Sequence, residues 1–189
     1  MRPLKTDRLR GLVADVASAS GVIIRKPLAR FADFTAGNRM MWAHLPNRDS
    51  PYWIFFDKET GLTRSPDVLC RWEEIPRLFP EGFFRAGIFD PPHTWFGKTS
   101  IHNDPSGRRG RWWGNPGDYG TLRRDVFLGQ RAFAKVLDGP LLFKWNETSV
   151  NLDRVLTLFT EWREVQRFPV SSSMQRGRDK TWWIKMVKR

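Results

Sequence analysis

The residues best suited to chemistry stand together as Asp90-Pro91-Pro92-His93. The apolar run before them predicts a buried strand that places Asp90 at the carboxyl edge of a sheet, where open α/β folds bind ligands. Pro91 and Pro92 lack N–H groups and restrict the backbone, so they predict a stiff turn with free carbonyl oxygens. A carboxylate and a carbonyl accept hydrogen bonds, and the His93 ring can stack. This set suits a planar amine, such as the exocyclic amine of a base, whose nitrogen attacks an electrophilic methyl group; an ordinary proline-rich turn is the alternative.

This arrangement resembles the motif of S-adenosylmethionine-dependent amino-methyltransferases in which Asp-Pro-Pro precedes Tyr, Phe, Trp or His. More closely, the chain resembles the small phage and prophage class I methyltransferases that act on adenine N6. The resemblance implies S-adenosyl-L-methionine as cofactor and catalytic roles for Asp90, Pro91, Pro92 and His93. At the last of these positions His is less common than Tyr, Phe or Trp.

A second acid, Asp33, ends an apolar run and is followed by a turn of small residues that contains Thr35, Ala36 and Gly37. Small residues in a turn after a strand let the backbone approach a ligand closely. The segment resembles the first cofactor motif of class I methyltransferases, in which many relatives have two or three glycines. The resemblance implies that these four residues hold the methionine part of the cofactor.

Residues 51–57 form another apolar run that ends in an acid, Asp57. Because Asp57 follows the first turn by about twenty residues, it stands where nucleotide-binding α/β folds bind ribose hydroxyls. Glu59 is a rival for that role, and an acid that caps a strand by chance is the alternative. Trp72 stands where the resemblance implies contact with the adenine of the cofactor, whereas Arg71 replaces an acid that phage relatives tend to have.

The segment after His93, residues 94–120, is rich in glycine and in arginines interleaved with tryptophans. Such a composition suits phosphates and unstacked bases together. We expect a mobile lid over the acceptor site, with a solvated insertion as the alternative. Its candidate substrate-binding residues are Trp95, Phe96, Lys98, Arg108, Arg109, Arg111, Trp112 and Trp113.

A further polar group, Lys144, Trp145 and Asn146, stands at the exit of an apolar run over residues 141–147. A similar segment is present in the phage methyltransferases. Because its polar end is expected at the same sheet edge as Asp90, these three residues are candidate substrate contacts. A buried lysine paired with an acid is the alternative.

The charge balance of the chain is strongly basic. Its 189 residues include 32 Lys and Arg against 20 Asp and Glu, a net charge of +12. This surplus favours a polyanion as partner, with nucleic acid foremost. The single Cys70 excludes an intrachain disulfide and a cysteine-rich zinc site, and the three histidines lack metal-ligand spacing. No apolar run is long enough for a membrane span and no signal-peptide core is present, so we expect a cytoplasmic location.

Strands that alternate with helices and end in a hairpin predict an α/β doubly wound sheet. The resemblance, which covers residues 30–187, implies a Rossmann-like class I methyltransferase fold: a mostly parallel seven-stranded sheet with a C-terminal antiparallel hairpin. We expect residues 1–29 to form an N-terminal helical extension and 30–189 a catalytic domain with 94–120 as its lid. The expected elements are strands at 83–89 and 141–147, helices at 122–137 and 152–159, and a hairpin of 164–168 with 180–187.

The function expected from these features is methyl transfer from S-adenosylmethionine to an exocyclic amine of a nucleic-acid base, with adenine N6 first, in DNA or RNA. A protein partner that selects the target is compatible with so short a chain. Two other interpretations stay open. A non-catalytic nucleic-acid-binding protein with a methyltransferase-like fold would explain Arg71 and the single glycine of the first turn. A small-molecule or protein N-methyltransferase would not need so large a positive charge.

Overall fold

The computed structural model describes residues 26, 28–37, 42, 50–91, 119–147, 150–170 and 180–189. Of the predicted N-terminal extension, only 26, 28 and 29 fall within these ranges. The predicted lid lies outside them except for its last two residues, which begin a helix.

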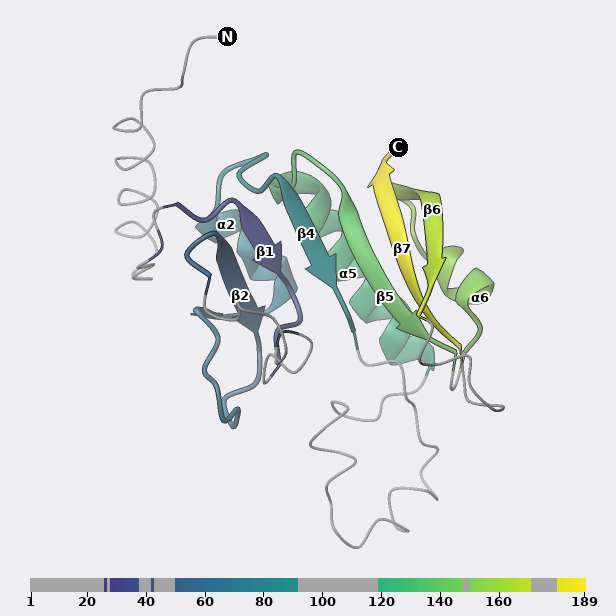
Figure 1. Cartoon of the computed structure of the whole chain (residues 1–189), viewed down its shortest axis with the longest axis horizontal. Coiled ribbons are helices and arrows are strands. Elements are labelled where there is room, and N and C mark those ends of the chain that lie inside the picture. Colours follow the sequence, from purple (N-terminus) through teal and green to yellow (C-terminus); the bar gives the residue numbers. More distant parts are fainter. Residues whose placement is uncertain are drawn as a thin grey trace, which may run out of the picture.

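In the described part of the chain, seven strands form one sheet in the spatial order β3-β2-β1-β4-β5-β7-β6 (Figure 1). The strands are β1 (Phe31–Asp33), β2 (Trp53–Asp57), β3 (Val68–Leu69), β4 (Ala86–Phe89), β5 (Leu141–Asn146), β6 (Trp162–Pro169) and β7 (Thr181–Lys188). The first five strands are parallel to one another, and β7 is antiparallel to both β5 and β6. The predicted mostly parallel sheet with an antiparallel C-terminal hairpin is therefore confirmed.

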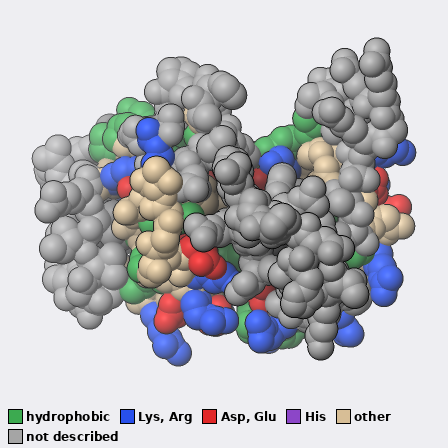
Figure 2. All heavy atoms as spheres, turned by 90° about the horizontal axis from the view of Figure 1, so that it is seen from below, with side chains coloured by type: hydrophobic (Ala, Val, Ile, Leu, Met, Phe, Trp, Pro, Cys, Tyr) green, Lys and Arg blue, Asp and Glu red, His purple; other side chains and the backbone are tan. Residues whose placement is uncertain are grey.

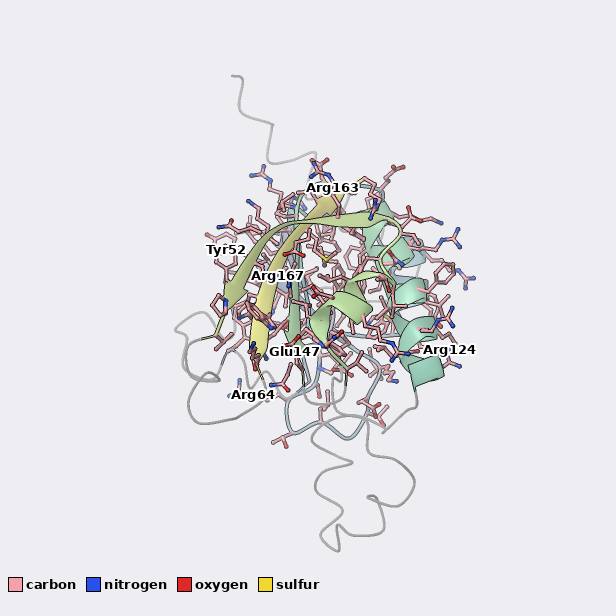
Figure 3. All side chains as sticks on the ribbon, turned by 90° about the vertical axis from the view of Figure 1, so that its right-hand side faces the viewer. Tyr52, Arg64, Arg124, Glu147, Arg163 and Arg167 are labelled. Atoms are coloured by element: carbon pink, nitrogen blue, oxygen red, sulfur yellow. The ribbon has the colours of Figure 1, made fainter. Side chains whose placement is uncertain are left out.

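The described helices lie on one side of this sheet (Figures 1 and 3). They are the 3-10 turn η2 (Trp72–Glu74), α2 (Ile75–Leu78), α5 (Tyr119–Val136) and α6 (Leu152–Leu156). Helix α6 ends before the predicted residue 159. Strand β4 begins later than the predicted residue 83, because Phe84 makes only an isolated bridge to Leu137. None of the described helices is long and apolar enough to cross a membrane.

The core follows from the alternation of side chains along the strands. Phe56, Phe89 and Phe143 belong to the large cluster that the helices cover. Their neighbours in sequence point to the other side, where Phe55 and Ile88 form a smaller cluster. The sheet thus has a helix-covered face and a second face with a much smaller apolar cluster.

Two glycines permit close approaches that position the strands. A Cβ at Gly87 would lie 2.5 Å from Cε2 of Phe34, whose ring stacks on Phe133 at 4.0 Å between centroids. A Cβ at Gly139 would lie 1.9 Å from the carbonyl oxygen of Arg85. The backbone between α5 and β5 can therefore run against the start of β4 only because residue 139 has no side chain.

A buried glutamine fixes α5 to the segment that leads into β6. The Gln130 side chain is fully buried; its Oε1 accepts hydrogen bonds from the backbone N–H groups of Thr160 and Glu161, at 2.7 and 3.0 Å. Its Nε2 donates to the carbonyl of Leu158 at 2.7 Å. Each side-chain polar atom thus has a partner, which a buried amide requires.

Candidate functional site

Three acids stand at the carboxyl ends of three neighbouring strands. Asp33 ends β1, Asp57 ends β2, and Asp90 follows β4, and these strands are adjacent in the order β2-β1-β4. Figure 2 looks onto this edge of the sheet and shows acidic side chains together with many Lys and Arg side chains. The sequence-based expectation that Asp90 lies at the carboxyl edge of a sheet is met.

Asp33 organises the turn after β1. Its side chain is fully buried; Oδ1 accepts from the backbone N–H of Thr35 at 3.0 Å, and Oδ2 accepts from Nε1 of Trp42 at 2.7 Å. Burial raises the pKa of Asp33 to about 6; the two hydrogen bonds act against that rise, and the nearby Asp90 and Asp57 add to it. The carboxylate therefore acts inside the fold and does not face solvent.

We expect the replacement Asp33→Asn to change how stability depends on pH. Because the folded-state pKa of Asp33 lies above its usual value, its contribution to stability is complete below about pH 4 and lost as the pH rises through about 6. The variant cannot titrate at this position. Its unfolding free energy, measured in urea relative to the parent, should rise by roughly 3 kcal/mol between about pH 4 and pH 7.

The exposed Asp138→Asn serves as the control for that measurement, since it removes a carboxylate from the surface. It should show no comparable rise. A difference between Asp33→Asn and the parent that stays constant over this pH range would contradict the assignment of a raised pKa to Asp33.

The turn after β1 reaches across to the end of β2. Gly37 has φ +49°, and its N–H donates to Oδ2 of Asp57 at 2.7 Å, while the N–H of Glu59 donates to Oδ1 at 2.9 Å. A Cβ at Gly37 would meet no atom within 4 Å, so open space lies beside this backbone. The neighbouring Ala36 is buried, and its N–H donates to the carbonyl of Phe56 at 3.0 Å.

The same turn is bonded directly to the acid of the Asp-Pro-Pro segment. The backbone N–H of Asp90 donates to Oγ1 of Thr35 at 2.7 Å. Lys144 Nζ donates to Oδ2 of Asp90, also at 2.7 Å, with 24% and 17% of the two side chains exposed. The pairing of Phe89 with Phe143 in the parallel β4–β5 ladder brings these two residues side by side. The lysine–acid pair considered as an alternative in the sequence is present.

Trp72 lies beneath this edge with its ring half-buried. Its Nε1 donates to the carbonyl of Phe34 at 2.8 Å, and its ring meets Phe89 edge-on at 5.0 Å between centroids. The neighbouring Arg71 is exposed, and its Nε donates to Oε1 of Glu73 at 2.8 Å. One side of the Trp72 ring thus packs against the core, and Arg71 forms an ion pair with Glu73 of its own turn.

No protein-family model matches the chain, and no curated protein matches it. Solved structures do resemble it in fold. The protein PH0851 aligns with a TM-score of 0.50 and 14% identity over 92% of this chain and 45% of its own. A mutant 16S rRNA (adenine(1408)-N(1))-methyltransferase from Catenulisporales acidiphilia, solved with its cosubstrate SAM, aligns with a TM-score of 0.46 and 15% identity over 98% of this chain and 91% of its own.

An rRNA methylase from Streptococcus thermophilus aligns with a TM-score of 0.46 and 12% identity over 100% of this chain and 98% of its own. The order of the strands and the antiparallel hairpin agree with the arrangement implied by the sequence resemblance. The chain has the predicted Rossmann-like α/β fold, a mostly parallel seven-stranded sheet with an antiparallel C-terminal hairpin. At these identities the likeness extends to the fold alone.

Of the two predicted substrate contacts that follow Lys144 in β5, Trp145 points to the opposite face of the sheet and Asn146 to the same face. Trp145 is fully buried among the residues covered by the helices, and its Nε1 donates to the carbonyl of Val150 at 2.8 Å. Asn146 lies on the same side as Lys144, and its Nδ2 donates to Oγ1 of Thr181 at 2.7 Å. Because side chains alternate along β5, Trp145 lies on the face of the sheet opposite to Lys144 and Asp90.

One aromatic residue beside the site was not identified from the sequence. Trp183 pairs with Lys144 across the β5–β7 ladder, and Nζ of Lys144 lies 5.9 Å from its ring centroid. The sequence places Trp183 in the last strand, but the register that sets it opposite Lys144 is fixed only by the antiparallel pairing. The remaining site residues predicted from the sequence lie outside the described ranges: Pro92, His93, Trp95, Phe96, Lys98, Arg108, Arg109, Arg111, Trp112 and Trp113.

Proposed function

We propose that the chain transfers the methyl group of S-adenosylmethionine to an exocyclic amine of a nucleic-acid base, with adenine N6 as the first candidate. The observation that carries this proposal is the hydrogen bond between Asp90 and Thr35. It joins the small-residue turn, which the sequence assigns to the cofactor, to the acid that it assigns to the acceptor. In this proposal the cofactor half and the acceptor half of the transfer site lie at one edge of the sheet.

The turn after β1 fits the methionine and ribose parts of the cofactor. The space beside Gly37 would admit a ligand against the backbone, because nothing lies within 4 Å of where a Cβ would be. Asp57 is half-buried, and a carboxylate has about four lone-pair positions, so ribose hydroxyls can donate to those its two backbone partners leave. In this proposal Asp33 braces the turn from within and Trp72 borders the adenine.

The cofactor supplies an electrophilic methyl group, so the chain contributes chiefly by positioning. Asp90 is expected to accept a hydrogen bond from the acceptor amine and to orient the nitrogen lone pair toward the methyl carbon. The Pro91 carbonyl is expected to accept a second bond, since proline leaves a stiff turn there. Lys144 holds the Asp90 carboxylate at 2.7 Å and so fixes its orientation at the strand end.

A nucleic-acid substrate is supported by the net charge of +12, which a small-molecule substrate would not require. A base inside a duplex would have to leave the stack before it could reach Asp90. A base in a single strand would not. Relaxed target choice and a partner protein that selects the site are both compatible with this proposal.

We expect Asp57→Ala to weaken S-adenosylmethionine binding about 10- to 100-fold, because it removes a charged acceptor for the ribose and the brace of Gly37. Isothermal calorimetry with the cofactor alone measures this directly. Glu59→Ala is the matched comparison: its side chain is exposed and only its backbone N–H contacts Asp57.

Glu59→Ala should bind the cofactor as the parent does. An equal loss of cofactor affinity in Asp57→Ala and Glu59→Ala would contradict the assignment of the ribose contact to Asp57. A parent chain that shows no heat of binding with S-adenosylmethionine would overturn the proposed function.

A further inference from the structure

Beyond Asp90 the sheet continues through β5, β7 and β6, and the face opposite the helices has a distinct composition. Trp183 stands opposite both Lys144 of β5 and Phe168 of β6. The adjacent row places Lys185 opposite Gln166, and Val187 opposite Arg163. Residues directly opposite one another share a face, so Lys144, Trp183, Lys185, Phe168, Gln166 and Arg163 lie together. We call this set the open face.

The open face is accessible over much of its area. Phe168 is 43% exposed, Trp183 is half-buried, and Lys185, Gln166 and Arg163 are exposed. Figure 3 views the sheet near its β6 edge, with α5 and α6 on the far side from this face. Phe168 stands on the face of β6 that no described helix covers, so the core that Trp162 joins on the other face does not account for it.

All charges on the open face are positive in the described residues of these three strands. Lys144, Lys185 and Arg163 are its ionised side chains, and the only acid in the three strands, Glu164, points to the other face. There its two carboxylate oxygens accept from Arg167 at 2.8 Å. Lys144, whose Nζ donates to Oδ2 of Asp90, connects the open face to the candidate site.

Packing between the two aromatics does not account for them. Although Phe168 and Trp183 are cross-strand neighbours, no ring contact joins this pair of described residues. Trp183 packs at the margin of the smaller apolar cluster, and Nζ of Lys144 lies 5.9 Å from its ring centroid. Aromatic rings on a sheet with interspersed cations are what proteins use to stack unpaired bases and contact the linking phosphates.

We propose that the open face binds a single-stranded stretch of nucleic acid next to the nucleotide whose base reaches Asp90. Phe168 and Trp183 stack on successive bases, and Lys185 and Arg163 contact phosphates. The inference rests on the proposed function for the placement of the acceptor base at Asp90. In a duplex the bases are paired and stacked on one another, so their faces cannot stack on Phe168 and Trp183. The bases of a single strand are exposed and can do so.

The test measures binding of a short fluorescently labelled, adenine-containing single strand, as RNA and as DNA, by anisotropy. Phe168→Ala should weaken binding about tenfold, in line with the loss of one stacked base. Lys185→Gln should lower the slope of log affinity against log salt by about 0.7, the loss of one phosphate contact on a single strand.

Helix α5 offers matched controls on the opposite side of the molecule. Phe127 is also 43% exposed, and Lys135 is an exposed lysine of the same helix. Phe127→Ala and Lys135→Gln should leave affinity within twofold and the salt slope unchanged. Thermal unfolding of all four variants checks that each is folded before binding is compared.

Equal losses in the open-face variants and in the α5 variants would overturn the inference, as would undiminished binding by Phe168→Ala. Calorimetry with S-adenosylmethionine separates this result from the fate of the proposed function. If the chain binds the cofactor but the open-face variants bind single strands as the parent does, only this inference is rejected. Open-face binding of single strands without cofactor binding would instead reject the proposed function and leave the surface assignment standing.

Discussion

Replacement of Asp90 by Asn is expected to lower the rate of methyl transfer about 10²- to 10³-fold, with little change in cofactor affinity. The amide keeps the size of the side chain but loses the charge that accepts the amine hydrogen bond. Loss of one such positioned charge typically costs this much in turnover. The hydrogen bond to Thr35 uses the backbone N–H of Asp90, so the turn that is proposed to hold the cofactor should survive the change.

Single-turnover assays at saturating cofactor and substrate measure this effect, with calorimetry to check cofactor binding. Asp138→Asn is the control, since Asp138 is exposed and distant from the carboxyl edge of the sheet. It should transfer methyl groups at the parent rate. An Asp90→Asn variant with more than about a tenth of the parent rate would show that the carboxylate is not what positions the amine.

The second large effect concerns folding. We expect Gly139→Ala to lower the unfolding free energy by about 3 kcal/mol or more, because the new Cβ would stand 1.9 Å from the Arg85 carbonyl oxygen. The clash is with backbone and cannot be relieved by a rotamer change. The start of β4 or the start of β5 must shift, and Asp90 and Lys144 stand at the far ends of these same strands.

Gly61→Ala provides the matched comparison for equilibrium unfolding in urea. A Cβ at Gly61 would meet nothing within 4 Å, and the residue is exposed. Its unfolding free energy should differ from that of the parent by no more than about 0.5 kcal/mol. Similar stability in the two variants would mean that β4 and the turn before β5 do not approach as closely as the structure shows.

The sheet could be predicted because β1, β2, β4 and β5 each read as a short apolar run that ends at or just before a polar residue. Asp33, Asp57 and Asp90 mark three such ends, and the structure places them at one edge. Element ends were predicted less well. Tyr119 begins α5 earlier than expected, and α6 is shorter, because helix ends depend on tertiary contacts that periodicity does not report.

The orientation of the side chains at the site could be predicted from the sequence only in part. Alternation along residues 141–146 would have shown that Trp145 faces away from Lys144 and toward the core, so that signal was available. The position of Trp183 was not, since a register between distant strands is set by pairing rather than by local sequence. Nor could spacing show that Trp42 would bond to Asp33 and seal it inside the fold.

In the proposed function, this edge of the sheet moves a methyl group from S-adenosylmethionine to a base amine. A transfer assay tests this by offering the methyl-labelled cofactor with single-stranded and duplex DNA and RNA, followed by nucleoside analysis of the products. We expect label in a base methylated on its exocyclic amine, with N6-methyladenosine or its deoxy form first, and loss of that label with Asp90→Asn. Label that persists in Asp90→Asn, or its absence from every nucleoside with all four polymers, would overturn the proposed function.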